Sequence, residues 1–252
     1  MKMLDYVKKR GVFVELFDNL YLVDEKTSEK LIDMGVDKLL MSIDGATAGT
    51  YEKVRPGSKF DRVIKHVRKL YELKKAKGAH FPHISFHYIV NKHNLHEMPQ
   101  FLELVSSVTG GERTSVMFTI LLHKYKEVED IFVDVPEEMI KKVEATAKNK
   151  AIDITWSLDI PQDKPTLDRC IEWTMPFIFV TGHVIPCCAG NEANGREYQK
   201  DTALGNIFEQ KFKDIWRGPK YTALRQMLLD RRLPAACVKC CIYEIRGKKC
   251  AS

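Results

Sequence analysis

Hydrophobic residues in the first two thirds of the chain form two kinds of segment that alternate. Short apolar runs rich in β-branched residues predict strands, over Val12–Phe17, Lys38–Ile43, His83–Val90, Thr114–Leu122 and Ile152–Trp156. Longer segments with apolar residues at helical spacing predict helices, over Met3–Lys9, Asp24–Met34, Phe60–Lys77, Asn94–Ser106 and Pro136–Lys148. Strand–helix alternation at this spacing is typical of right-handed βαβ units. We therefore expect an α/β fold built on a parallel sheet.

Residues with capping chemistry mark the ends of several predicted helices. Gly11, Gly35 and Gly78 each follow a helical segment, at the position where a left-handed residue is favoured. Asn94 is a predicted N-cap, with Pro99 in the first turns of the helix that follows it. These residues set the expected helix boundaries.

Polar residues follow three of the predicted strands. Asp18 and Asn19 follow the first strand, Ser42 and Asp44 end the second, and Asn91 follows the third. In parallel sheets the chemistry sits at the carboxyl ends of the strands, so these residues form a candidate site. Asp, Asn and Ser also cap turns, and the residues alone leave both interpretations open.

Histidines gather around the third predicted strand, at His80, His83, His87, His93 and His96. They lack the helical i, i+4 pair with a third ligand that is typical of a metal site, so we interpret them as surface or pocket residues. His87 lies on the same strand as Ser85 and is a candidate for lining a substrate cavity.

The first predicted element is a helix with no strand before it. A βα fold ordinarily begins with a strand, and Val12–Phe17 or a neighbour would otherwise be an exposed sheet edge. We therefore expect part of the fold to precede this sequence.

Seven cysteines are confined to the last third of the chain, at Cys170, Cys187, Cys188, Cys237, Cys240, Cys241 and Cys250. A disulfide scaffold would spread its cysteines through a small chain, so this distribution favours a soft-metal module in a reducing cytosol. The Cys237-x-x-Cys240 turn aims both sulfurs the same way, and cysteines from a distant segment complete four ligands. Sulfur ligation favours iron–sulfur or zinc over harder metals. The segment Gly182–Cys187 predicts a hairpin that presents Cys187 on its second strand.

Composition excludes several classes of protein. A hydrophobic content of 44% and a formal net charge of +6 exclude a disordered chain of 252 residues. No apolar run approaches the roughly 20 residues of a membrane span. Met1–Arg10 lacks the apolar core of a signal peptide, so we expect a cytoplasmic protein. No nucleic-acid-binding motif is present, and basic residues beside a redox cluster would instead suit an acidic electron donor.

Two stretches of the sequence resemble one known family. The first comprises Met41–Ala46, Thr50–Ser58 and Ile89–Phe101. The second comprises Cys170, Gly182-x4-Cys187, Leu204–Phe208, Asp214–Trp216 and Cys237-x-x-Cys240. In this order the motifs are similar to those of radical S-adenosylmethionine (radical SAM) enzymes with a C-terminal SPASM domain. The resemblance implies a partial radical SAM (β/α)6 barrel over residues 1–160 and a small cysteine-rich SPASM domain over residues 161–252.

The sequence departs from the family pattern at its front. The C-x3-C-x2-C motif that holds the SAM-cleaving cluster is absent, and so is the glycine-rich motif after the second barrel strand. Aligned on Ser42–Gly45, the chain looks N-terminally truncated, so that the first two barrel strands would be missing. Asp18-Asn19-Leu20 also stands where the family usually has Thr-Asn-Gly.

The resemblance also implies site residues and cofactors. Asn19, Ser42 and Asp44 would lie near bound SAM. An auxiliary [4Fe–4S] cluster would be bound by four cysteines, Cys170, Cys187, Cys237 and Cys240, with Cys250, Cys241 or Cys188 as substitutes. A second auxiliary cluster would need a cysteine where Arg246 stands, so we expect one cluster.

By this resemblance we expect a radical SAM/SPASM oxidoreductase or maturase that modifies a peptide or protein, with an acidic flavodoxin or ferredoxin as electron donor. Without the first cluster motif, this chain alone is not expected to cleave SAM. One alternative is a non-catalytic, cluster-bearing module that binds a peptide or serves as a subunit. Another is a structural zinc protein with four cysteine ligands. Anaerobic reconstitution with iron or zinc separates the zinc protein from the other two.

Overall fold

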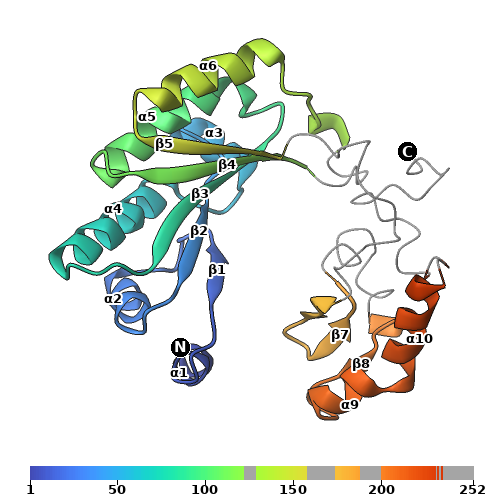
Figure 1. The fold of residues 1–252 in the computed structure, drawn as a ribbon. Helices are drawn as coiled ribbons and strands as arrows, with labels where there is room; N and C mark the ends of the chain where they lie inside the picture. The colour runs from blue at the N-terminus through green and yellow to red at the C-terminus, as the bar shows by residue number, and fades with distance from the viewer. Residues whose placement is uncertain (122–128, 158–173, 188–199, 231, 233, 235–252) are drawn as a thin grey trace. The chain divides into compact units, whose positions relative to one another are not determined.

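The computed structural model describes residues 1–121, 129–157, 174–187, 200–230, 232 and 234 (Figure 1). The chain divides into two compact units. The first contains described residues 1–121 and 129–157, and the second contains described residues 174–187 and 200–230. The predicted domain boundary between residues 160 and 161 lies outside the described residues. Among the helices that the structure describes, none has the length and apolar character needed to cross a membrane.

The first unit is built on a five-stranded sheet in which neighbouring strands are parallel and follow chain order. Its strands are β1 (Glu15–Asp18), β2 (Lys38–Ser42), β3 (His83–Val90), β4 (Thr114–Ile120) and β5 (Ile152–Ser157). The predicted α/β fold with a parallel sheet is therefore confirmed. The strand β1 begins three residues later than predicted, and before it the Val14 carbonyl accepts the N–H groups of Asp37 and Lys38.

One helix precedes the first strand of this sheet, and the others lie between successive strands. They are α1 (Lys2–Lys8), α2 (Glu25–Asp33), α3 (Ala48–Val54), α4 (Phe60–Ala76), α5 (Met98–Thr109) and α6 (Glu137–Lys148), with two short 3-10 turns at Leu95–Glu97 and Glu129–Ile131. Helices α2, α4, α5 and α6 cover one face of the sheet (Figure 1). The short helix α3 was not predicted, because Tyr51 is its only buried residue and gives no apolar periodicity.

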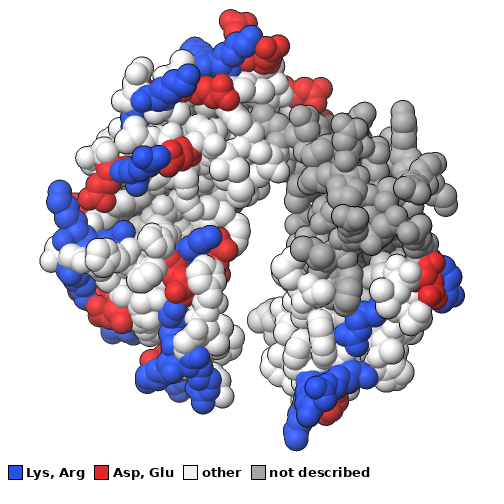
Figure 2. Space-filling model, viewed as in Figure 1, with Lys and Arg blue, Asp and Glu red and all other residues white. Residues whose placement is uncertain are grey.

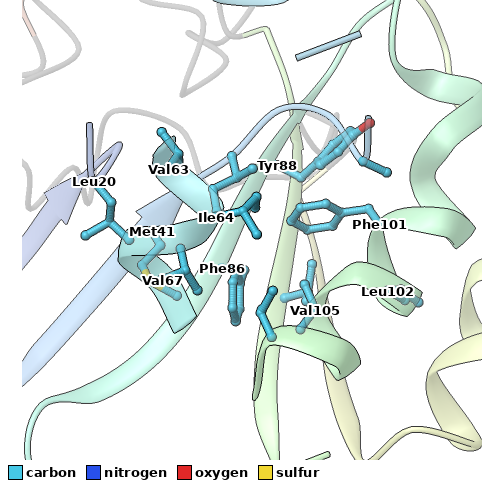
Figure 3. Packing of buried hydrophobic residues seen from close by; sticks show 14 of the residues in the cluster. Leu20, Met41, Val63, Ile64, Val67, Phe86, Tyr88, Phe101, Leu102 and Val105 are labelled. Carbon is cyan, nitrogen blue, oxygen red and sulfur yellow. The ribbon is translucent and has the colours of Figure 1, made fainter. Parts of the chain in front are cut away.

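Alternation along the strands separates the core from the opposite face of the sheet. In β3, Phe86, Tyr88 and Val90 are buried under the helices, and the rings of Tyr88 and Phe101 lie 4.7 Å apart (Figure 3). The intervening residue His87 is only half-buried, as are its neighbours on the same face. One sheet face is therefore packed, and the other is available to polar chemistry.

The start of α5 differs from the prediction. Asn94 does not cap a helix, because its side-chain oxygen accepts the backbone N–H of Asn91 at 2.8 Å. A 3-10 turn follows, and α5 begins only at Met98, with Pro99 in its first turn. The Asn94 side chain is thus used to close the turn after β3.

The second unit contains a small antiparallel sheet and two helices. Its strands are β6 (Phe177–Ile178), β7 (His183–Ile185) and β8 (Gly205–Asn206), in that order across the sheet. The helices α9 (Phe212–Arg217) and α10 (Pro219–Leu229) follow, and a core of Val184, Ile215 and Tyr221 joins them to β7. A hairpin is present where it was predicted, but Cys187 lies two residues beyond the end of its second strand, β7, and not on it.

Leu20 occupies a backbone conformation that glycine adopts most easily. Its φ angle is +59°, and its N–H donates to the Asp18 carboxylate at 2.6 Å. The Leu20 side chain is fully buried, and its carbonyl accepts the Nδ1–H of His66 at 2.7 Å. The Asp18-Asn19-Leu20 turn therefore keeps a left-handed third residue, although leucine stands where the resembling family usually has glycine. Burial of the leucine side chain offsets the conformational cost.

In most buried positions an alanine variant is more stable than a glycine variant, and at Leu20 we expect the reverse. Leu20→Ala loses about 2–5 kcal/mol of buried contacts and keeps the left-handed strain. Leu20→Gly loses the same contacts but relieves about 1–2 kcal/mol of strain, so it should unfold at higher urea concentration than Leu20→Ala.

Leu31, buried in the regular helix α2, is the matched control. There the glycine variant should be less stable than the alanine variant by about 1 kcal/mol. The same order at Leu20 as at Leu31 would contradict the strain argument.

Candidate functional site

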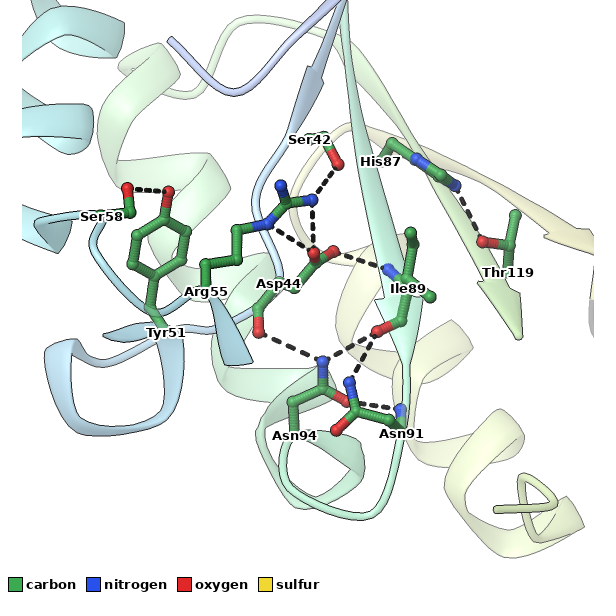
Figure 4. A network of polar contacts seen from close by, with 10 residues as sticks. All are labelled: Ser42, Asp44, Tyr51, Arg55, Ser58, His87, Ile89, Asn91, Asn94 and Thr119. Carbon is green, nitrogen blue, oxygen red and sulfur yellow. Dashed lines mark hydrogen bonds and ion pairs between the residues drawn. The ribbon is translucent and has the colours of Figure 1, made fainter. Parts of the chain in front are cut away.

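Arg55 brings together two of the three residues predicted to lie near SAM (Figure 4). Its Nε donates to the Asp44 carboxylate at 2.7 Å, and its Nη2 donates to Ser42 Oγ at 2.6 Å. The second Asp44 oxygen accepts the backbone N–H of Ile89 at 2.8 Å. These contacts lie at the carboxyl ends of β2 and β3, as expected for a parallel sheet.

Asp44 and Arg55 differ in burial, and this difference indicates different roles. The Asp44 side chain is only 4% exposed, whereas that of Arg55 is 24% exposed. A buried carboxylate needs charged or hydrogen-bonding partners, and Asp44 has them in Arg55 and Ile89. Asp44 therefore orients Arg55. The guanidinium has further N–H donors that these bonds do not use, so Arg55 and Ser42 can contact an anionic ligand.

Asn19 has a different environment. It is exposed, and its side-chain oxygen accepts the backbone N–H of Tyr21 at 3.0 Å, an Asx turn. Asn91 likewise serves its own turn, because its side-chain oxygen accepts the N–H of His93 at 2.9 Å. Asn94 connects this turn to the site, donating to the carbonyls of Asp44 at 3.1 Å and Ile89 at 2.8 Å.

His87 lies next to Ser42 on the open face of the sheet. The two residues are register partners on β3 and β2, and His87 Nε2 lies 2.8 Å from Thr119 Oγ1 on β4. Partial burial lowers the pKa of His87, the charge of Arg55 lowers it further, and the charge of Asp44 opposes both. His87 is therefore a neutral imidazole near pH 7, able to share hydrogen bonds with a ligand.

A row of side chains crosses the sheet at this level. Ser42, His87, Met117 and Thr155 are consecutive register partners on β2, β3, β4 and β5. Register partners on adjacent strands point to the same face. The row combines two hydroxyls, an imidazole and a thioether, which suits binding of a polar organic ligand by hydrogen bonds and contact.

Glu97 is a positioning residue that the sequence analysis did not identify. Its carboxylate is buried and accepts four hydrogen bonds, from Ala46 N at 2.7 Å, Thr47 N at 3.3 Å, Thr47 Oγ1 at 2.6 Å and Thr50 Oγ1 at 2.7 Å. It thereby fixes the loop between Asp44 and α3. Its partners lie about 50 residues earlier in the chain, so no local pattern reveals the contact.

In the second unit, Gly182 sits where no side chain fits. Its φ angle is +83°, and a Cβ atom there would lie 2.3 Å from Asn206 Oδ1 and 2.6 Å from the Phe208 ring. Asn206 Nδ2 donates to Thr181 O at 3.2 Å, and its Oδ1 accepts Phe208 N at 2.9 Å. The Gly182-x4-Cys187 motif and the Leu204–Phe208 motif therefore pack together, and this contact fixes the strand that leads to Cys187.

Cys187 is the one predicted cluster ligand within the described residues. It is half-buried and lies near Tyr221. Burial raises the pKa of Tyr221 to about 12; the charge of Arg225 opposes this rise, and the charge of Cys187 adds to it. The other cysteines, Cys170, Cys188, Cys237, Cys240, Cys241 and Cys250, lie outside the described residues. Within the part of the chain that is described, no three potential ligands gather into a metal site. A thiolate at the end of a firmly held hairpin fits one corner of an iron–sulfur or zinc site.

Comparison with known proteins extends this picture. Residues 170–241 match SPASM, an iron–sulfur cluster-binding domain. The chain is 23% identical over 257 residues to the tungsten-containing aldehyde ferredoxin oxidoreductase cofactor-modifying protein of Pyrococcus furiosus, a match that covers 97% of this chain and 70% of the relative. It is 26% identical over 261 residues to the AdoMet-dependent heme synthase of Methanosarcina barkeri, covering 93% of this chain and 68% of the relative.

Among solved structures, the chain is similar to Streptococcus suis SuiB. The TM-score is 0.63 to SuiB bound to S-adenosylmethionine, at 14% identity and over 96% of this chain. It is 0.58 to SuiB bound to the precursor peptide SuiA, at 14% identity and over 96% of this chain. The chain spans 56% of the length of the first of these SuiB chains and 55% of the second.

These similarities support the class predicted from the sequence, a radical SAM fold joined to a SPASM segment. The SPASM match begins at Cys170 and ends at Cys241, so it includes the four predicted ligands and the substitutes Cys188 and Cys241, but not Cys250. The likeness to SuiB shows a similar fold over 96% of this chain.

Replacing the carboxylate of Glu97 tests how the loop is held. In Glu97→Gln, the amide nitrogen meets N–H and O–H donors, so unfolding in urea should show a loss of about 2–4 kcal/mol. Glu103→Gln, which alters an exposed carboxylate paired with the half-buried Lys150, should change stability by less than about 1 kcal/mol.

The Glu97 effect should also depend on pH. Burial alone raises the pKa of Glu97, but hydrogen bonds from Thr47, Thr50 and the backbone outweigh it and lower the pKa. The stabilisation is therefore present above the unfolded-state value of about 4.3 and is lost as pH falls through the folded value. The difference in free energy of unfolding between the native protein and Glu97→Gln should therefore become smaller as the pH is lowered. A difference that does not change with pH would contradict the lowered pKa of Glu97.

Proposed function

We propose that this chain is part of a radical SAM/SPASM enzyme of the maturase type, with a peptide or protein as substrate and one auxiliary [4Fe–4S] cluster. The SPASM match over residues 170–241 is the observation that carries the proposal. Relatives are named as a cofactor-modifying protein and a heme synthase, and SuiB has been solved with a precursor peptide. The SuiB complex supports a peptide substrate, whereas the other two relatives are named for a cofactor and for heme.

The auxiliary cluster would be held by Cys170, Cys187, Cys237 and Cys240, with Cys250, Cys241 or Cys188 able to replace one of them. Four thiolates suit a [4Fe–4S] cluster, which would supply electron transfer or substrate positioning. In this proposal Gly182 and Asn206 hold the hairpin so that the Cys187 thiolate stays in place. An acidic flavodoxin or ferredoxin in the cytoplasm would be the electron donor.

SAM would bind at the carboxyl edge of the parallel sheet. The Arg55 guanidinium and the Ser42 hydroxyl would hold its carboxylate, Asp44 would orient Arg55, and Asn19 would lie beside the ligand. SAM supplies a 5′-deoxyadenosyl radical when it is reductively cleaved. Because the sequence contains no C-x3-C-x2-C motif, the proposal gives these residues the binding of SAM and not its cleavage.

Anaerobic reconstitution with iron and sulfide tests the cluster. We expect a brown protein with roughly four iron atoms per chain. Cys187→Ala and Cys237→Ala should each lower the iron content to below about half, because a cluster with three protein thiolates is lost more easily. Iron content is measured by chelation and visible absorbance.

Cys188→Ala is the matched control, since it removes a neighbouring thiol that the proposal uses only as a substitute, and it should keep the full iron content. Full iron content in Cys187→Ala would contradict the ligand assignment. Stoichiometric zinc without visible absorbance from iron would replace the proposal with the structural zinc protein.

Binding of SAM to the cluster-loaded protein tests the anion contact. Arg55→Lys keeps a positive charge beside Asp44 but loses the planar fork, so calorimetry should show a dissociation constant about tenfold higher. Arg62→Lys is the control, because Arg62 stacks on the Tyr21 ring at 4.5 Å and makes no contact with Ser42 in the described residues. Equal affinities for the two variants would remove Arg55 from the proposed site.

A second candidate, a non-catalytic cluster-bearing module or subunit that binds a peptide, is favoured by the absence of the C-x3-C-x2-C motif from this sequence. The DNA upstream of Met1 separates the two functions. An in-frame C-x3-C-x2-C motif there supports the enzyme, whereas a stop codon directly before Met1 favours the module.

A further inference from the structure

The β6 strand and the turn after it form an apolar edge. Residues 175–182 contain no charged side chain, and β6 is the outer strand of its sheet. The exposed fractions are 52% for Met175, 37% for Phe177, 40% for Ile178 and 95% for Val180. In Figure 2 the flank of the second unit that holds the β6–β7 hairpin is white, free of the coloured Lys, Arg, Asp and Glu.

Hydrogen bonding fixes which backbone groups lie on this edge. Phe179 N–H donates to His183 O at 2.9 Å, so residues 179 and 183 are a hydrogen-bonded pair. In an antiparallel ladder the pairs alternate, so the Ile178–Val184 pair is not hydrogen-bonded. The N–H and C=O of Ile178 therefore point away from β7, toward the open edge of the sheet.

The two edge strands of the parallel sheet carry charge, whereas β8, the other edge of the small sheet, consists of the uncharged Gly205 and Asn206. The edge strand β1 has Glu15 and Asp18 among its four residues, and the edge strand β5 has Asp153. Charged residues on edge strands oppose pairing with another chain. Within the part of the chain that is described, no strand pairs with the outer side of β6. The strand itself carries no charge, and Pro176, which has no N–H, comes directly before it. The open edge at Ile178 is thus unprotected by charge.

We propose that the open edge of β6 binds an extended, uncharged segment of the polypeptide substrate, which pairs with Ile178 as an added strand. Backbone hydrogen bonds would give affinity, and contact with Phe177, Ile178 and Val180 would select apolar side chains. A charged residue opposite these side chains would lose hydration without gaining a partner. The inference rests on the proposed function only for naming the polypeptide as the substrate.

A second copy of this chain fits the edge less well. A stable dimer buries roughly 800 Å² on each partner, which takes about 20–30 residues a side. The apolar edge offers four large exposed side chains, Met175, Phe177, Ile178 and Val180. A patch of this size suits a peptide strand that binds and leaves during turnover.

The experiment uses the full chain and a fluorescein-labelled, end-blocked octapeptide of alternating threonine and valine, with binding followed by fluorescence anisotropy. Ile178→Pro removes the outward N–H but leaves the Phe179–His183 hydrogen bond, so the dissociation constant should rise about tenfold or more. Ile178→Val, which keeps the N–H, should bind like the native chain. Hydrogen exchange of β7 should be the same in both variants.

Three results would overturn the proposal. They are no binding of the octapeptide, equal binding of an octapeptide of alternating lysine and glutamate, and affinity unchanged by Ile178→Pro. A concentration-dependent dimer in sedimentation that Ile178→Pro abolishes would assign the edge to a second copy instead. Peptide binding needs neither SAM nor cluster, so loss of iron with binding intact would count against the proposed function alone.

Discussion

The two-residue repeat of the β-strands is the constraint on which the first unit depends. It sends Phe86, Tyr88 and Val90 into the helix-covered core and leaves His87 on the opposite face. A shift of one residue in register would exchange the two faces, so the core and the candidate site are specified together. The same alternation in β4 places Thr119 beside His87. Packing and ligand binding are therefore two results of one geometric rule.

Two buried carboxylates then shape the loops at the edge of that sheet. Asp44 connects Arg55 to the backbone of Ile89, and Glu97 gathers the N–H and O–H groups that follow β2. Each is satisfied by several donors, which is what makes a buried negative charge tolerable. Because both carboxylates are fully engaged, they hold the site in shape, and the half-buried Arg55 and His87 are left to meet a ligand.

Local periodicity predicted most of the first unit, including β3 to the residue and α4 to within one residue at its end. It could not predict α3, which has one buried residue, nor the 3-10 turn that displaced α5, because Asn94 bonds to Asn91 instead of capping. The predicted order of strands correctly placed Ser42 and Asp44 at the carboxyl edge of the sheet. Their partner Arg55 and the anchor Glu97 emerge only from contacts between distant segments. Motif spacing, rather than periodicity, predicted the hairpin before Cys187.

The charge of Arg55 near His87 has a consequence for proton uptake. The positive charge of Arg55 contributes to the lowered pKa of His87, while Asp44 acts in the opposite direction. An anion bound to Arg55 would cancel that contribution, so the affinity of His87 for a proton would rise. By thermodynamic linkage, protonated His87 would in turn bind the anion more tightly. Ligand charge and proton binding would thus be coupled between the residue that follows α3 and a residue of β3.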